Sequence, residues 1–208
     1  MSKSKNIIDY YMLVNKLKYK VRNGWIEIGI EEERLESVAE HIYGCMMLAV
    51  AIDSEYELKL DINKVLKMLL LHELEEVLMK DYTIRDNITK EEKDKMGIRK
   101  VIEVTNGLLK QGEIVSLVEQ FNDRNTKEAI FAYHIDKIEC DMQAKTYDLR
   151  GSFNKEKAKE DLAFYGERKE EIEKNSKTAS DFWIEYDRPK YEDDEIFKDL
   201  IEKIKEYK

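Results

Sequence analysis

The chain has 208 residues, of which 42% are hydrophobic, so it is long enough to bury a sizeable core within one domain. It contains one proline and eight glycines, a composition that favours long helices over strands and tight turns. The formal net charge of −9 argues against a nucleic-acid polymer as partner, because the surface as a whole repels phosphate backbones. We therefore expect an all-α single domain.

Cysteine usage and hydropathy predict the compartment. Cys45 and Cys140 lie far apart within apolar helical patterns, which is typical of buried free thiols in a reducing compartment. The first 20 residues interrupt their apolar run at Asp9 and Lys16 and offer no small-residue cleavage site. The longest apolar stretches are too short to span a bilayer. We expect a soluble cytoplasmic protein with no membrane partner.

The first predicted helix covers roughly residues 7–17, where apolar residues recur at helical spacing. It ends before the glycine-bearing segment 22–25, and a loop should follow to about Glu36. Ser37 and Glu40 have the form of a capping box, which predicts a second helix that runs to about Ser54.

Asp61 is a plausible N-cap for a third helix, which should reach Leu78 and carry His72. A capping box at residues 89–92 starts the next helix, with an end expected beside Gly107 or Gly112. A short helix over residues 113–121 comes next.

A long helix is predicted from Thr126 to Gly151, with Asp136 on it. Beyond it, residues 155–174 and 192–208 are highly charged helical segments. The stretch between them, with Phe182, Trp183 and Pro189, should be less regular.

The residues that can carry chemistry are few. Of three histidines, His41 lies early in one predicted helix and His72 is followed at once by Glu73 in another. Imidazole and carboxylate are ligands that Mn²⁺, Co²⁺, Fe²⁺ and Zn²⁺ accept. Glu76, on the same helical face as His72, could handle the proton of a metal-bound water, and Asp81 follows the helix. Taken singly, each histidine is more often structural.

The settings of Asp136 and Glu75 lead to different interpretations. Asp136 stands between Ile135 and Ile138 on an apolar helix, a setting that favours a paired or metal-bound carboxylate. Glu75 is most simply a solvated helix residue.

Five ordered segments resemble a known family. They are residues 22–25 (RNGW), 36–44 (ESVAEHIYG), 70–81 (LLHELEEVLMKD), 88–93 (ITKEEK) and 136–148 (DKIECDMQAKTYD). In this order and at these spacings they resemble the HD-domain family of 5′-nucleotidases, which includes the bacterial YfbR-type 5′-deoxynucleotidases and their eukaryotic relatives. The resemblance covers roughly residues 7–150, the predicted core, and leaves helices at about 155–208 as additions.

This resemblance implies an orthogonal helical HD fold and a divalent metal ion (Mn, Co, Fe or Zn). The implied metal ligands are His41, His72, Glu73 and Asp136. Glu76 would be the catalytic acid or base. Asp81 would act in catalysis and touch the sugar, while Arg22 would bind the phosphate and Trp25 would pack beside the sugar. The family also implies a nucleotide substrate and a homodimer.

The sequence departs from the family pattern at two places. The defining His-Asp pair is His72-Glu73 here, and the extra methylene extends the carboxylate by about 1.5 Å, one carbon–carbon bond. The usual Gly-Asp is Lys80-Asp81, and the proline common soon afterwards is absent.

The leading hypothesis is therefore a metal-dependent phosphomonoesterase that acts on nucleoside or deoxynucleoside 5′-monophosphates. Two alternatives stay open at this point: a degenerate HD domain that binds nucleotide or metal without turnover, and a helical module that binds a partner through its charged C-terminal helices.

Overall fold

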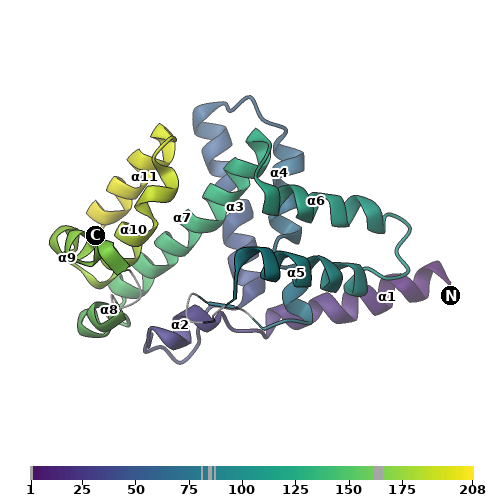
Figure 1. Cartoon of the computed structure of the whole chain (residues 1–208), viewed down its shortest axis with the longest axis horizontal. Coiled ribbons are helices and arrows are strands. Elements are labelled where there is room, and N and C mark those ends of the chain that lie inside the picture. Colours follow the sequence, from purple (N-terminus) through teal and green to yellow (C-terminus); the bar gives the residue numbers. More distant parts are fainter. Residues whose placement is uncertain (1, 81, 84–85, 87, 162–165) are drawn as a thin grey trace. The chain divides into compact units, whose positions relative to one another are not determined.

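Helices make up the regular structure of the chain (Figure 1). The computed structural model describes residues 2–80, 82–83, 86, 88–161 and 166–208. Within these residues the only β pairing is an isolated antiparallel bridge between Val21 and Ser37. The predicted all-α fold is confirmed.

The chain divides into two compact units. The first comprises Met1–Arg22 and Glu36–Ile135, and the second comprises Asn23–Leu35 and Asp136–Lys208. Each unit is therefore built from two separate stretches of sequence. That the whole chain forms a single domain stays a prediction.

The first unit holds the two histidines of interest. Its elements are α1 (Lys3–Val14), η1 (Asn15–Lys18), α3 (Val38–Tyr56), α4 (Ile62–Leu71), η2 (Leu74–Val77), α5 (Lys90–Val104), α6 (Gln111–Asp123) and the first part of α7 (Lys127–Leu149). Helix α3 packs along α4, α6 packs against both α4 and α5, and the short turn η2 packs against α5.

Side-chain caps mark the starts of α3, α4 and α5, as predicted. The Ser37 hydroxyl accepts from the Glu40 amide while the Glu40 carboxylate accepts from the Ser37 amide, so both groups of a capping box are present at α3. Asp61 accepts from the Lys64 amide at the start of α4. A second capping box starts α5 at Thr89.

Apolar packing fixes η2 and the end of α4 in place. Five buried side chains form one cluster: Leu71, Leu74, Val101, Val104 and Val118. Each buried aliphatic side chain contributes about 1.5–3 kcal/mol, so the cluster holds α4, η2, α5 and α6 firmly together. The segment after His72 is thus fixed by Leu74, although it is not part of a long helix.

The second unit is centred on α10. Its elements are α2 (Asn23–Glu27), the second part of α7, α8 (Lys155–Asp161), η4 (Gly166–Arg168), α9 (Lys169–Asn175), α10 (Ala179–Asp187), η5 (Arg188–Tyr191) and α11 (Glu195–Glu206). Helix α10 packs against α8, α9 and α11.

Two helices of this unit were missed by the sequence prediction. The stretch around Phe182 was expected to be irregular, but it forms α10, whose start carries a capping box between Thr178 and Asp181. Buried residues occur on all sides of α10, including the polar Asp181 and Glu185, so no solvent-facing side reveals a helical period. Helix α2, in the predicted loop, has five residues and is too short to show one.

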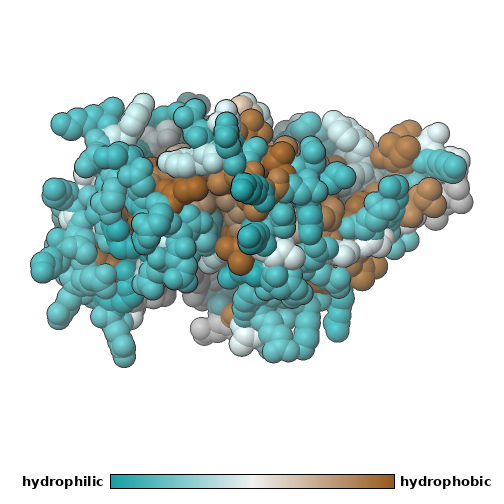
Figure 2. All heavy atoms as spheres, turned by 90° about the horizontal axis from the view of Figure 1, so that it is seen from above, coloured by the Kyte–Doolittle hydropathy of each residue, from teal (hydrophilic) through white to brown (hydrophobic). Residues whose placement is uncertain are grey.

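The hydrophilic surface and the buried cysteines match what the amino-acid composition predicts. Figure 2 shows hydrophilic side chains over most of the face that it presents. Cys45 and Cys140 are buried free thiols, as predicted. Among the described residues, none of the helices combines the length and the apolar composition that crossing a bilayer requires.

Candidate metal centre

His41 is placed by the start of α3. It lies four residues after the N-cap Ser37, so the capping box that fixes the first turn also fixes the position of His41. Its side chain is fully buried. A buried imidazole requires partners for its ring nitrogens, because an unpaired polar group in the interior is costly.

His72 ends α4, and this corrects one prediction. The expected helix to Leu78 stops at Leu71, with His72 as C-cap, and Glu73 already leaves helical geometry at φ −110° and ψ 19°. The imidazole Nδ1 lies 2.7 Å from the carbonyl oxygen of Leu69. In a continuing α-helix this carbonyl would accept from the amide of Glu73, so the side chain of His72 takes the place of the next helical bond.

The same hydrogen bond decides the tautomer of His72. A carbonyl oxygen can only accept, so Nδ1 carries the proton, and in the neutral imidazole Nε2 keeps a lone pair. Metal-binding histidines commonly use one nitrogen in this way to orient the other. His72 therefore presents Nε2 as a donor to whatever lies beyond it.

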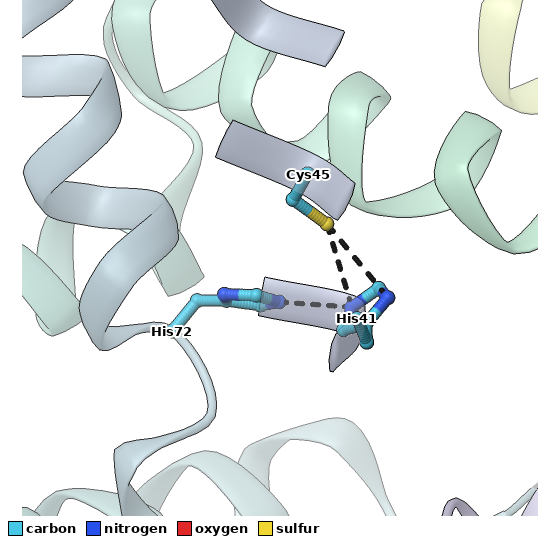
Figure 3. Close-up of side chains that lie close together, drawn as sticks. All are labelled: His41, Cys45 and His72. Carbon is cyan, nitrogen blue, oxygen red and sulfur yellow. Dashed lines mark hydrogen bonds between the residues drawn. The ribbon is translucent and has the colours of Figure 1, made fainter. Parts of the chain in front are cut away.

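The two histidines converge through their Nε2 atoms, which lie 3.2 Å apart (Figure 3). Two nitrogen ligands at about 2.05 Å from one ion lie about 2.9 Å apart at a right angle and about 3.3 Å apart at the tetrahedral angle. The observed separation falls between these values. The pair therefore fits a divalent cation between the rings.

Cys45 joins this cluster, and sequence reasoning did not foresee it. Its Sγ lies 3.6 Å from Nε2 and 3.7 Å from Nδ1 of His41, and Figure 3 shows it directed toward that ring. One signal was available: Cys45 is four residues after His41 on α3, on the same helical face. Ligand atoms of His41, Cys45 and His72 all lie within 4.8 Å of one another.

Glu73 supplies a carboxylate to the histidines. Its Oε1 lies 3.7 Å from Nε2 of His72 and 3.4 Å from Nη1 of Arg22. Both members of the Arg22–Glu73 pair are largely buried, which strengthens their attraction compared with a surface pair. The glutamate that departs from the family pattern is thus within reach of both a candidate metal ligand and the candidate phosphate-binding cation.

Glu76 lies on η2 and not on an α-helix with His72, so the predicted shared helical face is wrong. The 3₁₀ turn nevertheless keeps Glu76 buried, with only 3% of the residue exposed. Lys20 contacts it, with Nζ 3.5 Å from Oε2 and 2.6 Å from the main-chain oxygen of Glu76.

Glu75 is buried, which contradicts the expectation of a solvated residue. Burial, together with the negative charge of Glu73, raises the pKa of its carboxyl to about 8. Its neighbour across the packing interface is Gly97 of α5, where an added Cβ would lie 3.4 Å from Cγ of Glu75. A protonated carboxyl group at neutral pH is thus packed two residues from Glu73.

The remaining predicted site residues belong to the second unit or lie outside the described residues. Asp136, the first residue of the second unit, is buried on α7 and pairs with Lys137 at 2.7 Å. Trp25 of α2 is 2% exposed and packs against Tyr147 and Trp183, with ring centroids 5.3 Å and 5.2 Å away. Its contact with a sugar stays a prediction. Asp81 lies outside the described residues, so its role stays a prediction.

The fold and the site together define the class of this protein: an all-α protein with a candidate divalent-metal centre built on two converging histidines. Comparisons with known proteins agree with this class. The model of the HD domain family matches residues 14–180. The chain belongs to the HD-domain family.

Two relatives with assigned names indicate which branch of the family the chain resembles. The 5′-deoxynucleotidase HDDC2 of Dictyostelium discoideum is 35% identical over 150 residues, which cover 69% of this chain and 78% of the relative. The 5′-deoxynucleotidase hdd1 of Schizosaccharomyces pombe is 30% identical over 162 residues, covering 75% and 78%. These identities place the chain in the branch of the HD-domain family that contains the 5′-deoxynucleotidases.

Solved structures show the same fold. A conserved hypothetical protein from Pyrococcus furiosus has a TM-score of 0.69 at 23% identity, covering 96% of this chain and 99% of its own. A protein from Pyrococcus horikoshii has a TM-score of 0.68 at 22% identity. At this level of identity the likeness concerns the fold alone.

Proposed function

We propose that the protein is a metal-dependent phosphomonoesterase that hydrolyses nucleoside or deoxynucleoside 5′-monophosphates to nucleoside and phosphate. The observation that carries this proposal is the convergence of His41 and His72, whose Nε2 atoms lie 3.2 Å apart beside the Glu73 carboxylate. The names of the relatives, 5′-deoxynucleotidases, support the substrate class.

The proposed metal ligands are His41, His72, Glu73 and Asp136. Nitrogen and carboxylate donors suit Mn²⁺, Co²⁺, Fe²⁺ and Zn²⁺ alike, and the nitrogen separation in the site is compatible with both octahedral and tetrahedral coordination. Asp136 is proposed as a ligand because it is a buried carboxylate in the last of the family-like segments.

A divalent ion in such a site lowers the pKa of bound water and thereby supplies a nucleophile near neutral pH. The chain's own residues do the rest. Glu76, buried next to the ligand-bearing segment, moves the proton that must reach the leaving 5′-oxygen. Arg22 binds phosphate oxygens through its guanidinium, which matches their geometry in a bidentate contact.

Arg22 is already close to the centre, because its Nη1 lies 3.4 Å from Glu73. In a chain of net charge −9, a phosphate needs a local cation at the site, and Arg22 provides one. Sugar recognition by Trp25 and Asp81 completes the proposed set of substrate contacts.

Two broader features belong to the same proposal. We expect a homodimer: α1 exposes an apolar stripe of Ile7, Ile8, Tyr11 and Met12, each more than half exposed. We also expect a cytoplasmic location, because the two buried free thiols suit a reducing compartment. Light scattering of the wild type and of an Ile8→Glu variant tests the first expectation.

Phosphate release tests the activity directly. The purified chain is stripped with a chelator, reloaded separately with Mn²⁺, Co²⁺, Fe²⁺ or Zn²⁺, and given a panel of nucleoside and deoxynucleoside monophosphates. We expect turnover by the wild type, loss in His72→Ala, and no change in Glu91→Gln, a control carboxylate that is exposed and pairs with Lys95. Nucleotide binding without hydrolysis under every ion would contradict the proposal and favour a degenerate HD domain.

A further inference from the structure

Lys20 makes an unusual set of contacts for a lysine in a short connecting segment. Its Nζ donates to the main-chain oxygen of Glu76 at 2.6 Å and to that of Met79, and it lies 3.5 Å from Oε2 of Glu76. An ammonium group has three donors and no acceptor. The three oxygens near the Lys20 ammonium group belong to Glu76 in η2 and to Met79, two residues after η2 ends.

The backbone around Lys20 is held in an extended conformation. Val21 forms the isolated bridge with Ser37: the amide of Val38 donates to the oxygen of Lys20 at 2.8 Å, and the amide of Arg22 donates to the oxygen of Glu36 at 3.0 Å. This bridge ties the segment to the capping box that starts α3, the helix of His41.

Side chains two residues apart on an extended segment point to the same side. Lys20 and Arg22 are such a pair, and each meets one carboxylate of the opposing turn: Lys20 meets Glu76, and Arg22 meets Glu73. Glu73 is the N-cap of η2 and Glu76 lies within it, so two cations two residues apart face two carboxylates three residues apart.

The contacts of Lys20 fix both the main chain and the side chain of Glu76. Carbonyl groups at the end of a helical turn carry partial negative charge and lack partners along the turn, and a cation there stabilises the turn. The same ammonium group attracts the carboxylate of Glu76, which is 2% exposed at the side chain and thus poorly screened by solvent.

We infer that Lys20 is a positioning residue for Glu76: it clamps residues 76–79 and holds the Glu76 carboxylate in one orientation for proton transfer. This inference rests on the proposed hydrolase function for the role of Glu76 in proton transfer. The clamp itself rests only on the contacts of Lys20. The ammonium group of Lys20 contacts Glu76 and Met79, so its removal should leave the candidate metal-binding histidines in place.

The test uses the full chain with Lys20→Met, Lys20→Arg and the matched control Lys18→Met, whose ammonium group is exposed and lies 3.5 Å from the Tyr11 hydroxyl. Misorienting an acid or base removes part of its typical contribution of about 10²–10⁴-fold. We expect Lys20→Met to lower kcat at least about tenfold with KM and metal affinity within about threefold. Lys20→Arg should recover most of kcat, and Lys18→Met should match the wild type.

Amide hydrogen exchange tests the clamp without turnover. The amides of Leu78 and Met79 both donate to the oxygen of Glu75 and should exchange at least about tenfold faster in Lys20→Met, with no change in α3.

The possible results distinguish a failure of the proposed hydrolase function from a failure of the Lys20 clamp. A wild type that is inactive with every ion overturns the proposed function, and unchanged exchange at Leu78 and Met79 then overturns the clamp as well. An active wild type with unchanged kcat in Lys20→Met overturns the positioning role. So does a variant that loses metal and raises KM, because that pattern indicates a general structural defect.

Discussion

Trp25 offers the sharpest quantitative prediction, because its predicted substrate role and its observed packing differ in their consequences. The residue is 2% exposed in a cluster with Tyr147, Phe153 and Phe182, and Trp183 packs against the same cluster. An aromatic side chain of this kind buries about 150–250 Å², which at about 25 cal/mol per Å² corresponds to about 4–6 kcal/mol. We therefore expect Trp25→Ala to lower the free energy of unfolding by about 4 kcal/mol or more.

This loss is a large part of the total stability of about 5–15 kcal/mol that is usual for a domain. Urea unfolding followed by far-ultraviolet circular dichroism measures it, since the signal comes from the helices and does not depend on Trp25. The matched variant Trp25→Phe keeps most of the buried ring and should lose clearly less. A Trp25→Ala protein with wild-type stability and a raised KM would refute the assignment of Trp25 to the core and favour a substrate-facing ring.

Three further predictions concern the site and the second unit. Glu76→Gln should lower kcat by about 10²–10⁴-fold without changing metal affinity, measured by phosphate release and by competition with a chelator; unchanged kcat would exclude Glu76 as the acid or base. Glu73→Ala should weaken metal binding at least about tenfold while Glu73→Asp largely retains it, and equal affinities in the wild type and both variants would show that Glu73 is no ligand. Asp141→Asn should remove a pH dependence of stability. Burial and the nearby charge of Asp187 raise the pKa of Asp141 well above its usual range, so the folded chain keeps a proton that the unfolded chain releases above about pH 4. Stability should therefore fall as the pH rises above that value, by up to about 1.4 kcal/mol per unit; thermal unfolding of the variant between pH 5 and 9 should lack this slope, and parallel curves would contradict the reasoning.

Local sequence signals predicted where α3, α4 and α5 begin. Serine, aspartate and threonine caps act through hydrogen bonds to amides within three residues, so Ser37, Asp61 and Thr89 could be recognised without knowledge of the fold. The end of α4 could not be foreseen in this way. It depends on the imidazole of His72 bonding to the oxygen of Leu69, and the apolar pattern continues through Leu74 without interruption.

His41, His72 and Glu73 of the candidate site could be singled out from the sequence, whereas the contacts that hold the neighbouring side chains could not. His41 and His72 stood out because histidine is scarce in the chain, and the family-like segments singled out the same two residues. The contacts of Lys20 with Glu76 and of Arg22 with Glu73 depend on pairing between segments more than 50 residues apart, as the pairs 20–76 and 22–73 show. Such contacts carry no local periodicity. The burial of Glu75 likewise depends on the packing of η2 against α5.

The central claim is that His41 and His72 hold one divalent cation between their Nε2 atoms. Anomalous X-ray scattering from crystals grown with Mn²⁺ or Co²⁺ tests it most directly. The claim predicts a single anomalous peak within about 2.0–2.3 Å of both nitrogens. Crystals that contain the ion elsewhere, or show both imidazoles with no anomalous peak between them, would contradict it.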